Sequence, residues 1–184
     1  PVIVVPRIYA DSLVDATDPH SLSYLKDLTT KLAPDCPIVY CGNDIVAHRI
    51  GGDASGHIAD SRTLIWDNFY ANDYCPRRLF IGPWRRPAEA SNILLNPTGL
   101  IETDKLLLEV MLIGDDVDKW RDLLGQHLPP AFFTVAYYFD APYGFAPKFA
   151  PPPVEVALAA VDQLLWQWKS RLQREWYPVL MGLK

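Results

Sequence analysis

The sequence predicts an α/β fold in which a parallel sheet is covered by helices and followed by a helical segment. In residues 1–114, short runs that are apolar on both faces alternate with stretches of helical periodicity. Strands of that kind belong to parallel sheets buried between helices. In residues 115–184 the apolar positions keep a helical spacing, and no further strand is predicted. Two parts are therefore expected, with a boundary after Gly114.

Four strands and two helices are predicted in the first part. The strands are apolar runs closed by glycine or small polar residues, over residues 2–9, 36–42, 63–68 and 91–97. A helix over residues 18–32 carries leucines at every third or fourth position, with Asp18 or Ser21 as its N-cap. A glycine-rich loop with one or two helical turns is expected before Arg62, and a helix over residues 101–112 follows the fourth strand.

The second part contains two predicted helices with a linker between them. The first helix runs from Val117 to Leu128. Residues 129–153 are rich in proline and aromatic residues, and we expect them to form a linker that packs onto the rest of the chain. The final helix is predicted from Val154 to Trp176, because its apolar residues form a single stripe: Val154, Leu158, Val161, Leu165, Trp168 and Leu172.

Composition and charge argue against several classes of protein. The net charge of −5 disfavours nucleic-acid binding, because few cations are available to neutralise phosphates. No apolar run approaches the roughly 20 residues of a membrane span. The three cysteines lack metal-ligand spacing and the four histidines share no spacing, so neither a metal nor another cofactor is predicted. Unpaired cysteines favour a reducing compartment such as the cytoplasm. The sequence starts at Pro1, so a targeting signal cannot be read.

Small polar and aromatic residues follow the predicted strands at the points where the strands end. The first strand ends at Tyr9, the second at Tyr40-Cys41-Gly42, the third at Trp66 and Asn68 with Asp73 just beyond, and the fourth at Asn96. Parallel strands bring their carboxyl ends to one edge of the sheet, where binding sites gather. Amides and carboxylates can exchange hydrogen bonds with hydroxyl groups, and an aromatic face covers the C–H patch of a sugar ring. The pattern therefore indicates a sugar-binding site.

A purely structural interpretation stands beside this one. Asparagine and aspartate are common in turns after strands, and each polar residue taken alone fits that role. Asp67 is assigned to it outright, because it neighbours Trp66 and should point away from the edge that Asn68 faces. The four strand ends together favour the binding site but do not name a reaction.

These stretches resemble the family-84 glycoside hydrolases, which include the O-GlcNAcases and bacterial hyaluronidase-like N-acetylglucosaminidases. The stretch IWDNFYANDY is similar to the Trp-Asp-Asn…Asn-Asp signature of that family, and RRLFIGPW and ILLNPTG follow it in the family's order. The stretches VPRIY and IVYCGND resemble the two preceding strand ends, with Tyr40-Cys41-Gly42-Asn43 in place of the usual Trp-Thr-Gly-Pro. The resemblance covers Val2 to Met111.

The resemblance implies a fold, a reaction and a set of binding residues. Family members are (β/α)8 TIM barrels, so the four strands predicted here would be strands 5–8, the second half of the barrel. They remove terminal β-linked N-acetylglucosamine with retention, the substrate's own acetamide oxygen attacking the anomeric carbon to form an oxazoline. Tyr9 and Trp66 would wall the acetamide pocket, with Val5 near its methyl end. The polar sugar contacts would come from Asn68, Asp73 and Asn96, with Asp73 accepting from the outer hydroxyls.

The resemblance also implies that the catalytic acids are missing. In the family, two adjacent aspartates end the fourth barrel strand, which would lie upstream of Val2. We therefore expect a fragment, either nicked or truncated, that needs the N-terminal half of the barrel from a second chain or another copy. The pair Asp115-Asp116 is not assigned to catalysis, because it follows Gly114 and opens a helix, where acidic residues cap free N–H groups. No catalytic residue is predicted within the chain.

Three hypotheses remain open from the sequence. The first is the C-terminal part of a β-N-acetylglucosaminidase that acts on a glycoprotein or glycan bearing N-acetylglucosamine. The second is a non-catalytic carbohydrate-binding or interaction domain that retains the sugar pocket. The third is an unrelated α/β domain in which every strand-end residue is a turn residue. The natural aglycone and the oligomeric state cannot be read from the sequence.

Overall fold

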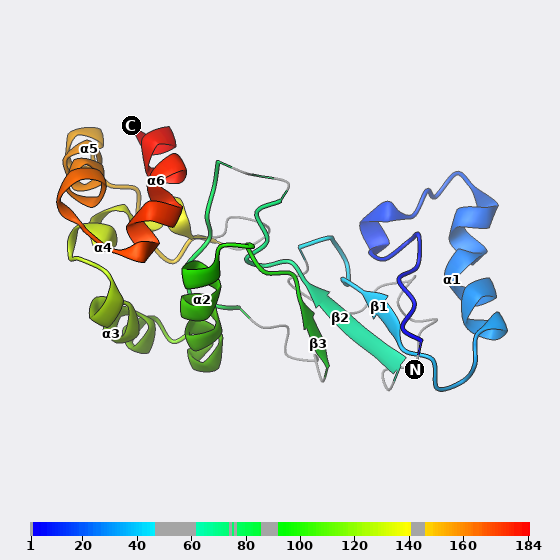
Figure 1. The fold of residues 1–184 in the computed structure, drawn as a ribbon. Coiled ribbons are helices and arrows are strands. Elements are labelled where there is room, and N and C mark those ends of the chain that lie inside the picture. The colour runs from blue at the N-terminus through cyan, green and yellow to red at the C-terminus, as the bar shows by residue number, and fades with distance from the viewer. Residues whose placement is uncertain (1, 47–61, 74, 76, 86–91, 141–145) are drawn as a thin grey trace. The chain divides into compact units, whose positions relative to one another are not determined.

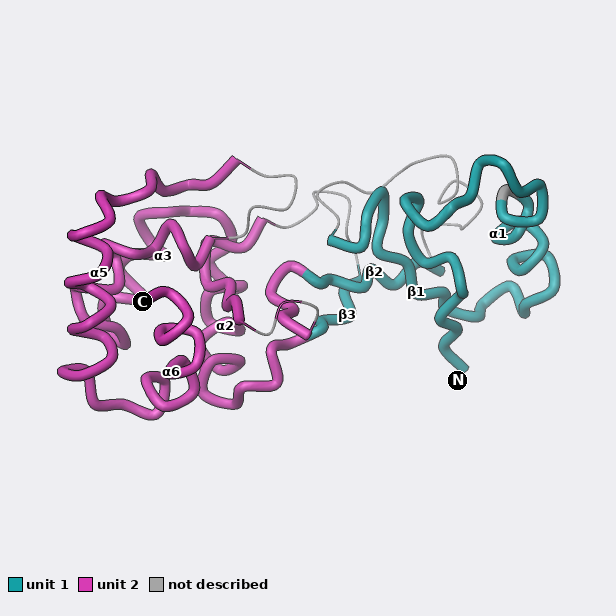
Figure 2. Tube along the Cα trace, turned by 90° about the horizontal axis from the view of Figure 1, so that it is seen from above, with its two compact units in different colours: residues 1–68, 86–96 teal, residues 69–85, 97–184 magenta. Residues whose placement is uncertain are grey.

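A computed structural model describes residues 2–46, 62–73, 75, 77–85, 92–140 and 146–184 of the chain (Figure 1). The chain divides into two compact units, each interrupted in sequence (Figure 2). Unit 1 comprises residues 1–68 and 86–96, and unit 2 comprises residues 69–85 and 97–184. The boundary expected after Gly114 remains a prediction.

Unit 1 is built on a small parallel sheet (Figure 1). Its strands are β1 (Ile38–Tyr40), β2 (Thr63–Asp67) and β3 (Ile93–Leu95), in the order β1-β2-β3. Ile65 pairs with Tyr40 on one side and with Ile93 on the other. The second, third and fourth predicted strands are thus confirmed, and the α/β character of the chain with them. The loop predicted before Arg62 falls largely on residues 47–61, outside the described residues.

The first predicted strand differs from expectation. Residues 2–9 lie along β1 but form only an isolated parallel bridge, between Val4 and Ile38. Pro6 offers no N–H to a ladder, and the N–H of Arg7 donates instead to the Tyr24 hydroxyl, at 2.9 Å. The run was predicted to be buried, yet Val2 is 73% exposed. The β-branched pattern therefore identified an extended segment and overestimated its burial.

A helix covers the start of the sheet in unit 1. Helix α1 (Pro19–Lys31) begins at Asp18, whose carboxylate accepts a hydrogen bond from the His20 N–H. This confirms the predicted helix and selects Asp18 as its cap over Ser21. Leu25 of α1 packs with Ile38 and Tyr40 in a buried cluster.

Unit 2 consists of helices around an aromatic core. Helix α2 (Ile101–Ile113) packs against α3 (Val117–His127) and against α6 (Arg171–Leu183). Both α2 and α3 were predicted. The Leu100 cap residue of α2 makes no side-chain capping bond. Instead, the Glu175 carboxylate of α6 accepts hydrogen bonds from the Glu102 and Thr103 N–H groups, at 3.0 and 2.9 Å.

The linker prediction for residues 129–153 is wrong for its first part. Helix α4 (Ala131–Val135) and a 3-10 helix (Ala136–Phe139) form there, and α4 packs on α5 (Val154–Asp162). The reason is aromatic burial: fully buried rings gather from α3, α4, the 3-10 helix and α6, namely Trp120, Phe132, Phe139 and Trp176. Burying these rings stabilises helical turns that local sequence does not favour.

The single final helix predicted from Val154 to Trp176 is also wrong. Helix α5 passes into a π-helix (Gln163–Gln167), the chain becomes extended at Trp168, and α6 starts afresh. The Ser170 hydroxyl caps α6 by accepting from the Gln173 N–H, at 2.9 Å. The expected stripe is not buried along its whole length either: Val161 and Leu165 are buried, whereas Val154 at the start of α5 is exposed. Across the described ranges, no helix combines the length and apolarity needed to cross a bilayer.

Candidate functional site

The strand ends of unit 1 meet through backbone hydrogen bonds. The Cys41 N–H donates to the Tyr9 carbonyl at 2.6 Å, and the Asn96 N–H donates to the Asp67 carbonyl at 2.9 Å. The extended segment and β1 therefore end level with each other, as do β2 and β3. This is the edge at which binding sites form in parallel sheets.

Two aromatic rings at this edge lie against each other. The ring centroids of Tyr9 and Trp66 are 5.5 Å apart with planes at 47°, although β1 lies between their segments in the sheet order. Both side chains are half-buried, so part of each ring stays open to solvent. Val5, from the same segment as Tyr9, is 55% exposed. The three residues predicted to form an apolar wall thus belong to unit 1, and the two rings among them touch.

The two strand-end asparagines form an amide pair. The Asn96 Nδ2 group donates to Asn68 Oδ1 at 2.9 Å. Asn68 is only 5% exposed, and its own Nδ2 group donates to the Ile45 carbonyl at 2.9 Å and to the Cys41 sulfur at 3.4 Å. Both amide hydrogens of Asn68 are therefore used inside the protein, which leaves it acceptor capacity alone. Asn96 is less buried, and among the described residues its side chain is seen only to donate to Asn68, so its Oδ1 and second amide hydrogen can serve an outside partner.

Two buried residues at the end of β1, Tyr40 and Cys41, were not assigned to the site by sequence reasoning. Burial raises the pKa of the Cys41 thiol to about 12, so this thiol stays neutral. Burial likewise raises the pKa of Tyr40, and its hydroxyl donates to the Asp11 carboxylate at 2.5 Å. Tyr40 and Cys41 occupy positions where the sequence departs from the family pattern. That departure was the sequence signal that could have drawn attention to them.

Asp73 lies in unit 2, unlike the other five predicted binding residues. It is exposed and follows Asn72, whose carbonyl accepts from the Cys75 N–H at 2.9 Å. Its predicted role as acceptor for outer sugar hydroxyls remains a prediction, as do the roles assigned to Val5, Tyr9, Trp66, Asn68 and Asn96.

The acidic pair in unit 2 has structural contacts. The Asp116 carboxylate accepts from the Lys119 N–H at 3.1 Å and caps α3, and this bond is the first cause of its lowered pKa. Asp115 lies 3.6 Å from the Lys148 ammonium group. Within the residues that the structure describes, no three His, Cys, Asp or Glu side chains are grouped to hold a metal ion.

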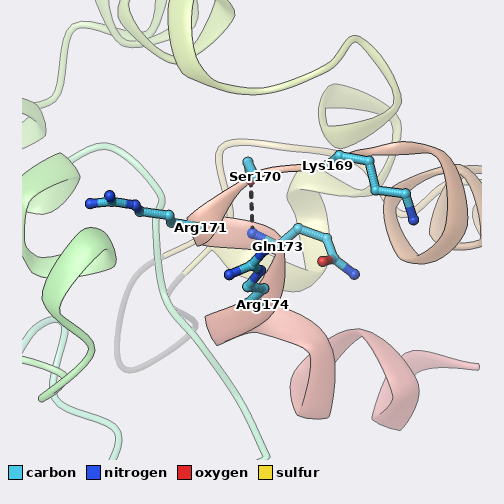
Figure 3. A pocket seen from close by; sticks show the side chains of 5 residues that line it. All are labelled: Lys169, Ser170, Arg171, Gln173 and Arg174. Atoms are coloured by element: carbon cyan, nitrogen blue, oxygen red, sulfur yellow. Dashed lines mark hydrogen bonds between the residues drawn. The ribbon is translucent and has the colours of Figure 1, made fainter.

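A pocket of about 280 Å³ lies at the start of α6. Its lining is basic and polar, formed by Lys169, Ser170, Arg171, Gln173 and Arg174 (Figure 3). The Lys169 and Arg171 side chains point in opposite directions, and Arg171 lies 3.5 Å from Glu102 (Figure 3). No aromatic ring or carboxylate lines this pocket, so its chemistry differs from that of the strand-end site.

The strand-end residues fall within a stretch that matches a known family. Residues 1–109 match the family model described as beta-N-acetylglucosaminidase. The chain belongs to this family. The resemblance to family-84 glycoside hydrolases is thereby confirmed, and the chain is part of a glycoside hydrolase family.

Relatives and solved structures agree with this assignment. The chain is 28% identical to the Protein O-GlcNAcase of Rattus norvegicus over 96 residues, and equally so to that of Mus musculus. The match covers 48% of this chain and 10% of each relative, so the chain spans about a tenth of their length. By structure, 98% of the chain superimposes on 47% of a mutant Thermobaculum terrenum O-GlcNAc hydrolase, with a TM-score of 0.66 and 18% identity. It also covers 38% of CpGH84D, with a TM-score of 0.63 and 16% identity.

Proposed function

We propose that this chain is part of a retaining β-N-acetylglucosaminidase that removes terminal N-acetylglucosamine from a glycoprotein or glycan. The observation that carries the proposal is the family match over residues 1–109, which contains all six predicted binding residues. The substrate's acetamide oxygen is the nucleophile, through an oxazoline, so the enzyme needs no nucleophile of its own.

The predicted binding residues suit the binding half of this reaction. The paired rings of Tyr9 and Trp66 form a wall against which the acetamide and the sugar's C–H face pack. Asn96 donates to and accepts from hydroxyl groups, while the buried Asn68 holds it and contributes acceptor capacity. Asp73 accepts from the outer hydroxyls, in line with its exposure.

In this proposal the two catalytic aspartates come from protein outside this sequence. The sole Asp-Asp pair in the sequence is Asp115-Asp116, and Asp116 caps α3. Residues 2–9 and the three strands would be strands 5–8 of a (β/α)8 barrel, whose N-terminal half supplies the acids. Exposed apolar side chains support such a partner: Val2 and Ile3 beside β1, Leu94 in β3, and Ile101, Leu108 and Leu112 along α2.

A complementation experiment tests the proposal. The chain alone should not hydrolyse an aryl N-acetylglucosaminide above background, and co-expression with the N-terminal half of the barrel should restore turnover. Thiazoline mimics of the oxazoline should inhibit that turnover, because the substrate's acetamide is the nucleophile.

The double variant Asp115→Asn/Asp116→Asn serves as the control in the complemented enzyme and should leave kcat nearly unchanged. If the isolated chain turns over substrate and this variant abolishes turnover, the acidic pair is catalytic and the assignment of the strands is wrong. Sugar binding without turnover in the complemented protein would instead favour a carbohydrate-binding domain. The cytoplasmic location predicted from the free cysteines remains part of the proposal.

A further inference from the structure

The segment that carries Asp73 is built into the helical unit. After β2, residues 69–85 belong to unit 2, and the end of this segment is buried among the helices. The N–H groups of Ile81 and Gly82 both donate to the Phe139 carbonyl, at 2.7 and 3.1 Å. The Trp120 Nε1–H of α3 donates to the Ile81 carbonyl at 2.8 Å. Helices beyond Gly114 therefore determine where this segment runs.

A buried ion pair holds the end of the segment. One Arg85 nitrogen lies 2.9 and 2.8 Å from the two carboxylate oxygens of Asp140, and the two side chains are 8% and 0% exposed. The Lys148 N–H donates to the same carboxylate at 2.5 Å. A Cβ atom added at Gly82 would collide with Asp140 Oδ1, so glycine is what allows the carboxylate to come this close. Removing one partner would take from the other the countercharge that this buried ion pair supplies.

The start of the segment rests on its end. The Tyr70 hydroxyl donates to the Gly82 carbonyl at 2.7 Å, and the Arg85 guanidinium lies 5.9 Å from the centre of the Phe69 ring. The rings of Phe69 and Tyr70 meet edge to face, with their centroids 4.9 Å apart. The start and the end of the segment are thus joined, and Asp73 lies three residues after Tyr70.

We propose that the Arg85–Asp140 ion pair is a positioning device for Asp73, all three residues belonging to unit 2. This inference rests on the proposed function, because it takes Asp73 as the acceptor for the outer sugar hydroxyls. A segment whose start and end are joined restricts where Asp73 can lie, and that restriction reduces the entropy lost when a hydroxyl is bound.

A double-variant comparison in the complemented enzyme tests the proposal. Asp140→Asn keeps the size of the side chain and removes its charge. With an aryl N-acetylglucosaminide, Asp140→Asn and Asp73→Ala should each lower kcat/KM about tenfold, and the double variant should fall little below Asp73→Ala alone. Asp140→Asn should also lose its effect on a substrate that lacks the C4 and C6 hydroxyls. Asp122→Asn, an equal charge change on the exposed side of α3, should leave kcat/KM unchanged.

The outcomes separate the two proposals. Losses that multiply in the double variant, or a wild-type kcat/KM in folded Asp140→Asn, would overturn the positioning role while leaving the proposed function intact. If Asp140→Asn fails to fold, Arg85→Lys replaces it, because lysine keeps the charge but offers a single ammonium group in place of the guanidinium. A complemented wild-type enzyme that never turns over N-acetylglucosaminides would overturn the proposed function and this inference together.

Discussion

Replacing Asn68 by aspartate changes one group at the centre of the strand-end site. The side chain keeps its shape and keeps Oδ1 as acceptor for Asn96. In the native chain the Asn68 Nδ2 group donates to the Ile45 carbonyl at 2.9 Å. The aspartate presents an oxygen to that carbonyl instead, so this hydrogen bond is lost. The weaker bond to the Cys41 sulfur, at 3.4 Å, is lost as well.

The expected cost follows from these contacts. Losing a neutral hydrogen bond costs about 1 kcal/mol, and leaving a buried carbonyl unsatisfied costs about 1–3 kcal/mol more. Asn68→Asp should therefore lower the free energy of unfolding by about 3 kcal/mol at pH 7. Burial raises the pKa of a carboxyl, so the folded-state value should exceed the ordinary value near 3.9. The loss of unfolding free energy in Asn68→Asp should therefore be largest at neutral pH. It should shrink as pH falls through the raised pKa, because the protonated acid can then donate a hydrogen bond to the Ile45 carbonyl.

Urea unfolding at pH 7 and pH 5 measures both effects. Gln126→Glu is the matched control, since it makes the same amide-to-acid change on the exposed surface of α3 and should cost under about 0.5 kcal/mol. A deficit for Asn68→Asp no larger than that of the control would refute the reasoning. So would a deficit that is the same at both pH values, because the carboxyl would then not titrate against the Ile45 carbonyl.

Three further predictions concern other parts of the chain. The Cys41 thiol has a pKa of about 12 instead of the ordinary 9.0, so the folded protein holds about a thousandfold less Cys41 thiolate at pH 8. A thiol reagent should therefore label Cys41 far more slowly in native than in unfolded protein. Because the folded pKa is the higher one, the thiol's contribution to stability should be complete below about pH 9 and lost as pH rises toward 12; a Cys41→Ala variant with the same alkaline unfolding curve would contradict this. Glu175→Ala removes the capping bonds at the start of α2 and should lower the free energy of unfolding by about 2–3 kcal/mol, against almost nothing for Asp122→Ala. Trp66→Ala should lower the free energy of unfolding by about 2–3 kcal/mol, below the range for fully buried tryptophans, and should weaken inhibitor binding. Wild-type stability together with wild-type inhibitor binding would contradict the placement of Trp66 in the apolar wall.

Much of the fold follows from the sequence because its signals are local. Strands β1, β2 and β3 appear as short apolar runs, and α1, α2 and α3 as helical spacings. The caps at Asp18 and Asp116 were predicted because a capping side chain binds an N–H only two or three residues away. The membership of the family likewise rests on contiguous motifs, which a sequence displays directly.

Errors arose where distant residues decide the conformation. Residues 131–139 form helical turns despite their flanking prolines, because Phe132 and Phe139 pack with Trp176, which lies far along the chain. The final helix breaks at Trp168, whose ring meets Trp176 edge to face at 5.4 Å, and Ser170 then caps a new helix. The stripe of apolar residues predicted one helix because periodicity depends only on sequence spacing. It gives no sign of a break whose cost is offset by tertiary packing.

The candidate site shows the same division. The sequence determined which residues end each strand, and so named Tyr9, Trp66, Asn68 and Asn96 as neighbours at one edge. Only the tertiary structure decided that Asn68 donates both amide hydrogens inward, to partners 23 and 27 residues away. Strand order brings residues to the same edge, but the direction of a side-chain amide depends on which buried acceptors surround it in space, and those acceptors come from chain segments that no local pattern connects.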